Sequence, residues 1–110
     1  MWNPNVTAAR GEEYLDTNHP GWYRKVRITD LDMSNSKVCI LGFCFGDYWE
    51  ALAKITSKPI FRASDNDERW AVTHGFNVPA FLQMQGGYER LALSWLPLIR
   101  ERRKARKQVK

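Results

Sequence analysis

The chain has 110 residues, which is enough for one hydrophobic core and too few for two full domains. Hydrophobic residues make up 44% of it and include five tryptophans, a composition that argues against disorder along the whole chain. No apolar run reaches the roughly 20 residues of a membrane-spanning helix, and the first residues do not have the pattern of a signal peptide. Two cysteines are too few for a disulfide scaffold, so we expect a soluble protein in a reducing cytoplasm.

The net charge of +5 is concentrated at the C-terminal end of the sequence. Residues 100–110 hold seven Lys/Arg and one Glu, whereas residues 1–99 hold ten Lys/Arg and eleven Asp/Glu. The net charges are therefore +6 and −1. We predict a helical globular domain over 1–99 and a basic extension over 100–110, which either continues the last helix or is disordered.

A first helix is predicted over residues 5–16, with Asn5 as its N-cap. Its apolar face is weak and consists of Ala8, Gly11 and Leu15. The helix should end before His19-Pro20-Gly21, because the residue that precedes a proline is pushed out of helical geometry. An irregular connector follows, in which residues 29–32 could form one helical turn.

Residues 36–56 carry the strongest pattern, and we predict one continuous central helix there. Apolar residues recur at spacings of 3, 4, 3, 4 and 3, namely Val38, Leu41, Phe45, Tyr48, Leu52 and Ile55. A helix that is apolar on most sides belongs in the middle of a fold. Gly42 and Gly46, four residues apart, are not a phosphate loop and would let a neighbouring backbone approach closely.

A third helix is predicted to start near Ser64 or Asp65. Gly75 should end it as a left-handed cap, with Phe76 as the accompanying apolar contact. The extended residues 59–61 could pair with 76–81 as two short strands.

The last helix should begin near residues 86–88 and be kinked or restarted at Pro97. Its predicted buried stripe consists of Tyr88, Leu91, Ala92, Trp95, Leu98 and Ile99. The predicted fold class is thus mainly α, a four-helix single domain around the central helix, with at most one short β-pair.

No metal site or cofactor is predicted. Zinc needs four ligands at short paired spacings, whereas Cys39 and Cys44 are five residues apart and only the isolated His19 and His74 could join them. Cys39 lies in the first turn of the predicted central helix, where the helix dipole can lower the pKa of a thiol. Burial of both thiols in the core is the alternative that we favour.

We predict no catalytic residues and no enzymatic activity, since the sequence has no nucleophile elbow, zincin motif or dinucleotide fingerprint. His74 could serve as a general base, but stabilising the end of a helix explains it better. Two groups of acidic residues fit the caps of turns and helices. The first is Asp30 with Asp32, and the second is Asp65, Asp67 and Glu68.

The basic extension is a candidate nucleic-acid-binding site. Its cations are Arg100, Arg102, Arg103, Lys104, Arg106 and Lys107, with Lys110 at the end. They could neutralise several phosphates without sequence specificity, and Arg24, Lys25 and Arg27 could add to them. No aromatic residue is interleaved for base stacking. Alternatively, these cations complement the dipole of the last helix and keep the protein soluble.

Three aromatic residues that lie outside the cleanest apolar stripes are candidates for an exposed protein-interaction patch. These are Trp22, Tyr23 and Trp70. Large aromatic side chains are favoured anchors at interfaces. Burial of each in the core is the competing interpretation.

Several segments, in this order, resemble the small uncharacterised proteins encoded by mycobacteriophages and other phages of actinobacteria. They are RGEEYLD (10–16), HPGWYRKVRITDLDM (19–33), KVCILGFCFGDYWEAL (37–52), WAVTHGFN (70–77) and ERLALSWLPLIRERR (89–103). Phe43, Cys44 and Pro97 depart from the pattern. The resemblance implies a phage protein that is made in the cytoplasm of a bacterial host and is absent from the virion. It implies no reaction and no catalytic residues.

The function expected from the sequence is that of a non-enzymatic phage accessory protein that binds a host or phage macromolecule. The alternative is a nucleic-acid-binding accessory protein that acts through the basic extension. No membrane partner is expected, and the sequence does not indicate an oligomeric state.

Overall fold

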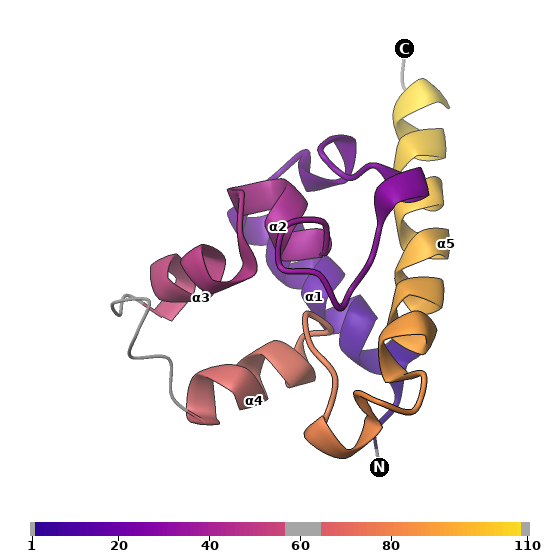
Figure 1. Cartoon of the computed structure of the whole chain (residues 1–110). Coiled ribbons are helices and arrows are strands. Elements are labelled where there is room, and N and C mark those ends of the chain that lie inside the picture. The colour runs from indigo at the N-terminus through magenta and orange to yellow at the C-terminus, as the bar shows by residue number, and fades with distance from the viewer. Residues whose placement is uncertain (1, 57–64, 109–110) are drawn as a thin grey trace.

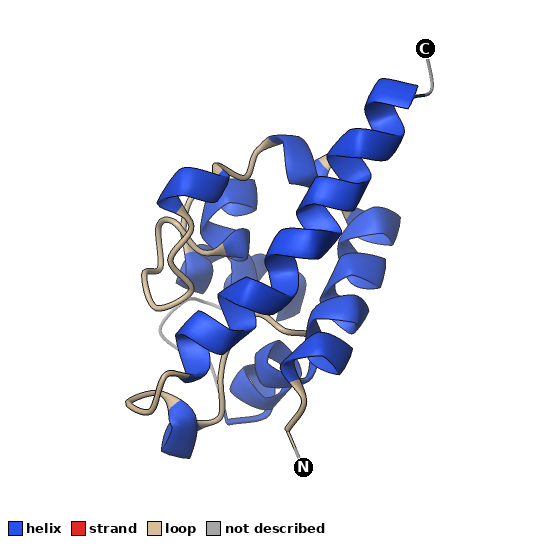
Figure 2. Cartoon of the chain, turned by 90° about the vertical axis from the view of Figure 1, so that its right-hand side faces the viewer, coloured by secondary structure: helices blue, strands red, loops and turns tan. Residues whose placement is uncertain are grey.

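Five α-helices make up most of the chain in the computed structural model, which describes residues 2–56 and 65–108 (Figure 1). They are α1 (Pro4–Asn18), α2 (Ile40–Phe45), α3 (Tyr48–Thr56), α4 (Asp65–Thr73) and α5 (Gly87–Gln108). The connections within the described ranges include the single-turn 3-10 helices η1 (Trp22–Arg24), η2 (Ile28–Asp30) and η4 (Ala80–Leu82). The described chain contains helices and loops and no strand, so the mainly α prediction is confirmed (Figure 2).

Of the expected β-pair, residues 59–61 lie outside the described ranges. Its other half, residues 76–81, forms bends and the start of η4. Among the described helices, none is both long enough and apolar enough to cross a membrane.

Helix α1 begins earlier than the sequence pattern predicts. Asn3 is the N-cap, and its Oδ1 accepts hydrogen bonds from the backbone N–H groups of Asn5 (3.0 Å) and Val6 (3.3 Å). Pro4 occupies the first helical position, where the missing N–H costs nothing. The predicted cap at Asn5 is therefore wrong. The predicted apolar face is confirmed, because Ala8, Gly11 and Leu15 are buried.

The predicted continuous central helix is wrong, because the chain breaks into α2 and α3 at Gly46. This glycine has a φ of 96°, which an L side chain rarely adopts, and it ends α2. Asp47 then caps α3, with Oδ2 accepting from the N–H groups of Trp49 (2.9 Å) and Glu50 (3.2 Å). At Gly42 the expected close approach of a backbone is confirmed, since a Cβ there would lie 2.5 Å from the carbonyl carbon of Lys37. At Gly46 the same expectation is wrong, because a Cβ there would meet only the Glu50 side chain, at 3.9 Å.

The end of α4 matches the sequence prediction. Gly75 has a φ of 72°, its N–H donates to the Val72 carbonyl (3.2 Å), and the N–H of Phe76 donates to the Ala71 carbonyl (2.8 Å). These two bonds make up a Schellman motif. Phe76 is 1% exposed, so the turn both stops the helix and delivers an aromatic ring to the core.

The turn at Gly75 lies where α1, α4 and α5 meet. A Cβ on Gly75 would lie 2.6 Å from the Cα of Ala8, so only glycine lets the turn pack this closely against α1. From the other side, the indole Nε1 of Trp95 donates to the Gly75 carbonyl oxygen at 2.6 Å. Gly11 also lies against this indole, so α1 and α5 pack closely at the same level.

A chain of aromatic rings extends from this junction through the core. Trp95 stacks on Phe76 with ring centroids 5.7 Å apart and meets Trp22 edge to face at 5.5 Å. Phe76 in turn stacks on Trp70 at 5.7 Å. Residues from the η1 turn, α4 and α5 thus share one aromatic core.

Helix α5 runs unbroken from Gly87 to Gln108 with Pro97 inside it, so of the two outcomes predicted at Pro97, a kink or a restart, the restart is wrong. Pro97 and Leu93 are both exposed. Because Pro97 has no N–H, the Leu93 carbonyl oxygen does not receive the usual helical hydrogen bond. It lies on the exposed side of α5, where water can replace that bond.

Gly75 and Gly86 test the packing of the α4 turn as a matched pair, since both have a positive φ (72° and 79°). At Gly86 a Cβ would meet nothing within 4 Å. We expect Gly86→Ala to cost about 1 kcal/mol through backbone strain alone. Gly75→Ala should cost roughly 3 kcal/mol or more, because the strain is joined by a collision with the α1 backbone. Urea unfolding of both variants measures the difference, and equal losses would contradict this packing.

Candidate nucleic-acid interface

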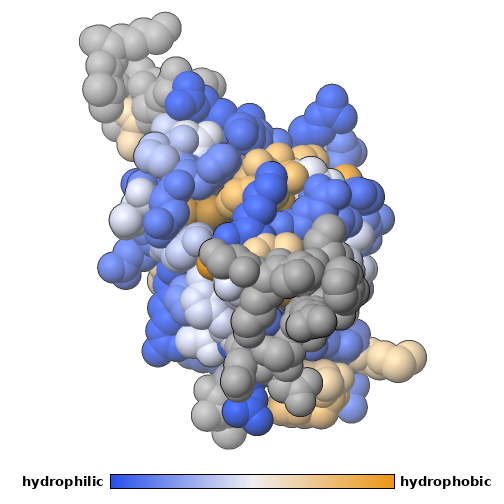
Figure 3. Space-filling model, turned by 90° about the vertical axis from the view of Figure 1, so that its left-hand side faces the viewer, coloured by the Kyte–Doolittle hydropathy of each residue, from blue (hydrophilic) through white to orange (hydrophobic). Residues whose placement is uncertain are grey.

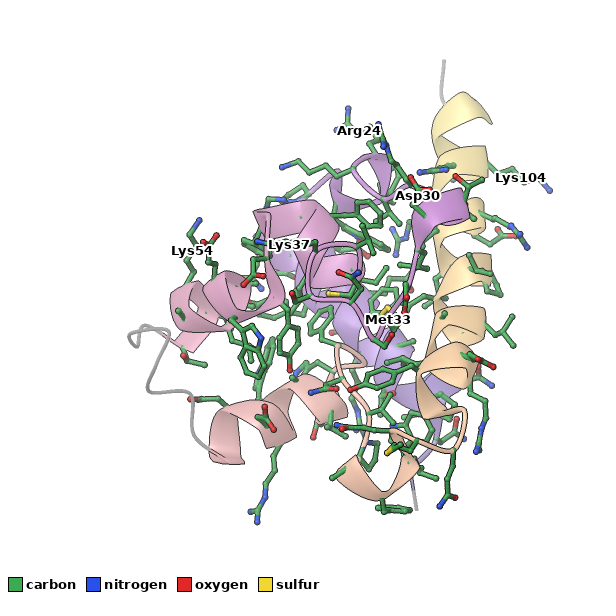
Figure 4. The ribbon with its side chains drawn as sticks, viewed as in Figure 1. Arg24, Asp30, Met33, Lys37, Lys54 and Lys104 are labelled. Carbon is green, nitrogen blue, oxygen red and sulfur yellow. The ribbon has the colours of Figure 1, made fainter. Side chains whose placement is uncertain are left out.

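The last turns of α5 project beyond the rest of the fold, as the two perpendicular views show (Figures 1 and 2). Arg100 and Lys104 are exposed on this segment. In Figure 4 Lys104 points away from the body, and Arg24 lies at the same end of the molecule. The helix continues through Arg106 and Lys107 to Gln108, but the side chains of these two cations lie outside the described part.

The segment with η1 and η2 adds further cations at this end. Turn η1 packs against α5, and Arg24, Lys25 and Arg27 are all exposed. Arg27 pairs with Asp30 at 3.5 Å, and Lys25 Nζ lies 3.3 Å from Nε2 of His19. Burial and the positive charge of Lys25 lower the pKa of His19. We call the five exposed cations Arg24, Lys25, Arg27, Arg100 and Lys104 the basic end.

Arg102 does not belong to this exposed set, because it joins α5 to α1. Its Nε lies 3.1 Å from Oε2 of Glu12, and its Nη2 lies 2.5 Å from Oδ2 of Asp16. The other Asp16 oxygen, Oδ1, accepts a hydrogen bond from the Trp22 indole at 3.0 Å. One guanidinium thus links α5, α1 and the η1 turn through two carboxylates four residues apart.

Arg103 reaches the η1 turn from the same segment. Its Nη2 donates to the backbone carbonyl oxygens of Tyr23 (3.1 Å) and Val26. These carbonyls lie where the η1 turn ends and no regular hydrogen bond continues. We refer to the contacts of Arg102 and Arg103 together as the arginine latch.

Six cations of the extension were predicted to bind nucleic acid, and the four whose side chains the structure describes fall into two groups. Arg100 and Lys104 are exposed, as binding requires, whereas Arg102 and Arg103 are partly buried against the body. The first 99 residues and the extension are not structurally separate at this point. The sequence reasoning missed the pairing of Arg102. The signal that could have indicated it is the spacing of Glu12 and Asp16, which are four residues apart and therefore share one face of α1.

The predicted aromatic interaction patch is wrong for Trp22, which is fully buried because it packs on Trp95 and hydrogen-bonds to Asp16. Tyr23 and Trp70 are half-buried and pack against the core. The sequence reasoning missed the apolar side chains that are exposed. They include Phe81 at 72%, Met84 at 97% and Leu93 at 66%. On the face shown in Figure 3, hydrophobic areas are separated by hydrophilic residues.

Neither cysteine has the features of an activated thiol. Cys39 and Cys44 are 1% and 7% exposed and are unpaired. Burial raises the pKa of Cys39 even though the Gly42 N–H donates to its sulfur at 3.3 Å. Burial also raises the pKa of Cys44, to about 12. The preferred interpretation of both residues as core thiols is confirmed.

His74 and Asp32 have local structural partners. His74 Nδ1 lies 2.8 Å from the Trp70 carbonyl oxygen, which requires Nδ1–H as the donor, and its ring stacks on Trp70 at 4.2 Å. Asp32 accepts from the N–H and hydroxyl of Ser34 at 2.9 and 2.6 Å, as a turn cap does. Among the side chains that the structure describes, in residues 2–56 and 67–105, no three His, Cys, Asp or Glu come together as a metal site would require.

In a comparison with known proteins, no protein-family model, curated protein or solved structure matches the chain.

Thiol labelling tests the burial of the two cysteines. With 5,5′-dithiobis(2-nitrobenzoate) at pH 8, both thiols of the native protein should react on the order of a hundredfold more slowly than in 8 M urea. Absorbance at the wavelength of the released thiolate gives both rates. Rapid reaction of one thiol in the native protein would contradict its burial, and its disappearance in Cys39→Ser would restore Cys39 as a candidate nucleophile.

Proposed function

We propose that this chain is a non-enzymatic binding protein whose partner is nucleic acid, contacted by the basic end. The observation that supports this most is the meeting of cations from two distant segments, 24–27 and 100–104, at one end of the fold. The sequence resemblance supplies the proposed setting, a phage accessory protein in the cytoplasm of a bacterial host. The buried thiols and the capping role of His74 support a binding role in preference to a catalytic one.

The charges of the basic end are available for phosphate. Among the described residues, Arg24, Arg100 and Lys104 have no carboxylate partner, whereas Arg102 is held by Glu12 and Asp16. The arginine latch fixes the end of α5 against the η1 turn, so the two cationic segments keep their relative positions. A preformed arrangement loses less conformational entropy on binding than a disordered tail does.

Binding of this kind is sequence-independent and salt-dependent. Each neutralised phosphate releases counterions and adds about −0.9 to the slope of log affinity against log salt concentration for duplex DNA. The basic end has five cationic side chains, and one of them, Arg27, is already paired with Asp30. We therefore expect a slope of roughly −3 to −4 from the described cations.

Fluorescence anisotropy of labelled duplex and single-stranded DNA across a salt series tests the proposal. Arg24→Gln with Lys104→Gln should weaken binding at low salt about tenfold or more and reduce the slope by about 2. The matched control is Lys54→Gln with Arg69→Gln, which removes the same charge from α3 and α4. Figure 4 shows Lys54 far from the basic end.

The proposal fails if the wild-type protein does not bind either DNA at low salt. It also fails if both double variants lose affinity equally, because net charge and not the basic end would then account for binding.

A second candidate is docking of a host or phage protein at the η4 turn. Phe81 and Met84 expose 72% and 97% of their surface there, which is unusual for large apolar side chains. Phe81→Ser with Met84→Ser separates the two candidates, since it should leave the affinity for DNA unchanged and abolish only the capture of a protein partner.

A further inference from the structure

A small pocket of about 100 Å³ lies between the segment that carries Met33 and Cys39, the start of α3 at Tyr48, and Asn77. Met33 is labelled in Figure 4 in front of α1. The pocket has both polar and apolar walls, and no charged side chain lines it. Tyr48 and Asn77, on its inner wall, are 6% and 9% exposed. This site has no part in the proposed binding of nucleic acid.

The hydrogen bonds of Asn77 determine which way its amide points. Its Oδ1 accepts from the Val78 N–H at 2.8 Å, and it accepts from the Tyr88 hydroxyl at 3.3 Å. A flipped amide would place two donors against each other at Val78, so Nδ2 must face Tyr48. Nδ2 donates to the Tyr48 hydroxyl oxygen at 2.9 Å.

The hydroxyl proton of Tyr48 therefore needs an acceptor other than Asn77. Among the hydrogen bonds of the described residues, the Tyr48 hydroxyl has one partner, the Asn77 Nδ2 that donates to it, and no bond accepts its own proton. Burial raises the pKa of Tyr48, so the group stays a protonated donor at neutral pH. A buried donor without an acceptor is costly, which indicates that something in the pocket completes its hydrogen bond.

The neighbouring surface offers a way in. An outer pocket of about 540 Å³ lies between the 31–34 segment and the start of α5, and it shares Met33, Ser34 and Tyr88 with the inner pocket. A ligand can therefore enter along this wall. The inner volume is below the roughly 150 Å³ of a cavity that holds benzene, so the inserted group has about six heavy atoms or fewer.

We propose that the inner pocket binds a small uncharged molecule, or the uncharged head of a larger one, through a carbonyl-type acceptor that receives the Tyr48 hydroxyl proton. The walls explain the neutral ligand class, since a charged group would be desolvated there without a counter-charge. The rings of Trp49 and Phe76 cover the apolar part of the ligand.

Cyclopentanone is the probe, because it has six heavy atoms, one acceptor and no charge. Its control is cyclopentylammonium, which has the same ring and size but carries a charge and has no acceptor. In ¹H–¹⁵N spectra of the full chain, cyclopentanone should shift the Asn77 side-chain and Val78 backbone signals in a saturable way, with a Kd on the order of 1 mM. Cyclopentylammonium should leave these signals unchanged.

Two variants locate the effect. Tyr48→Phe keeps the ring and removes the donor, so it should weaken cyclopentanone binding about tenfold. Tyr14→Phe, on the α1 face that does not line the pocket, should not change it. Should Tyr48→Phe not fold, Ser34→Phe at the shared mouth should block the same shifts.

The proposal is overturned if cyclopentanone causes no saturable shifts in the wild-type protein, because the pocket then holds only water. Equal shifts with cyclopentylammonium, or full affinity in a folded Tyr48→Phe, would overturn it as well, and if that variant does not fold, full affinity in Ser34→Phe would do so.

Discussion

The hydrogen bond from the Trp95 indole to the carbonyl oxygen of Gly75 joins α5 to the turn that ends α4, at the point where this turn packs against α1. Gly75 ends α4 with a positive φ, packs against the α1 backbone at Ala8 and sends Phe76 into the aromatic core. Trp95 lies on Gly11 and meets Trp22 of the η1 turn. Helices as short as α2 and α3 are stable only through tertiary packing, and α3 packs on α4, which this junction joins to α1 and α5.

The arginine latch extends the same organisation to the C-terminal end. Asp16 accepts from the buried Trp22 indole and also pairs with Arg102, so a core residue and a surface cation share one carboxylate. Arg103 donates to the carbonyl oxygens of Tyr23, in the η1 turn, and of Val26, two residues after it. The extension is therefore divided: two of its arginines stabilise the fold, while its exposed cations join Arg24 and Lys25 in the proposed interface.

Local signals in the sequence predicted most helix ends, whereas the errors came from competing or distant signals. Gly75 followed by Phe76 predicted a Schellman turn because all of its partners lie within six residues. At Gly46-Asp47 a stop and a cap were both present, but the continuous apolar pattern concealed them. The roles of Trp22 and Arg102 depend on Asp16, at sequence distances of 6 and 86, and charge composition does not reveal such pairing. The small pocket at Tyr48 depends on segments that only the fold brings together.

Amide hydrogen exchange along α5 tests most directly whether the basic extension belongs to the folded body. If the arginine latch holds, the amides of residues 101–104 should be protected within about tenfold of those at 95–99. Glu12→Gln with Asp16→Asn should remove that protection and leave residues 95–99 unchanged, since the amide oxygen introduced by the second substitution can still accept from the Trp22 indole. Exchange of 101–104 at the rate of an unstructured peptide in the wild-type protein would contradict the account and leave the extension a detached tail.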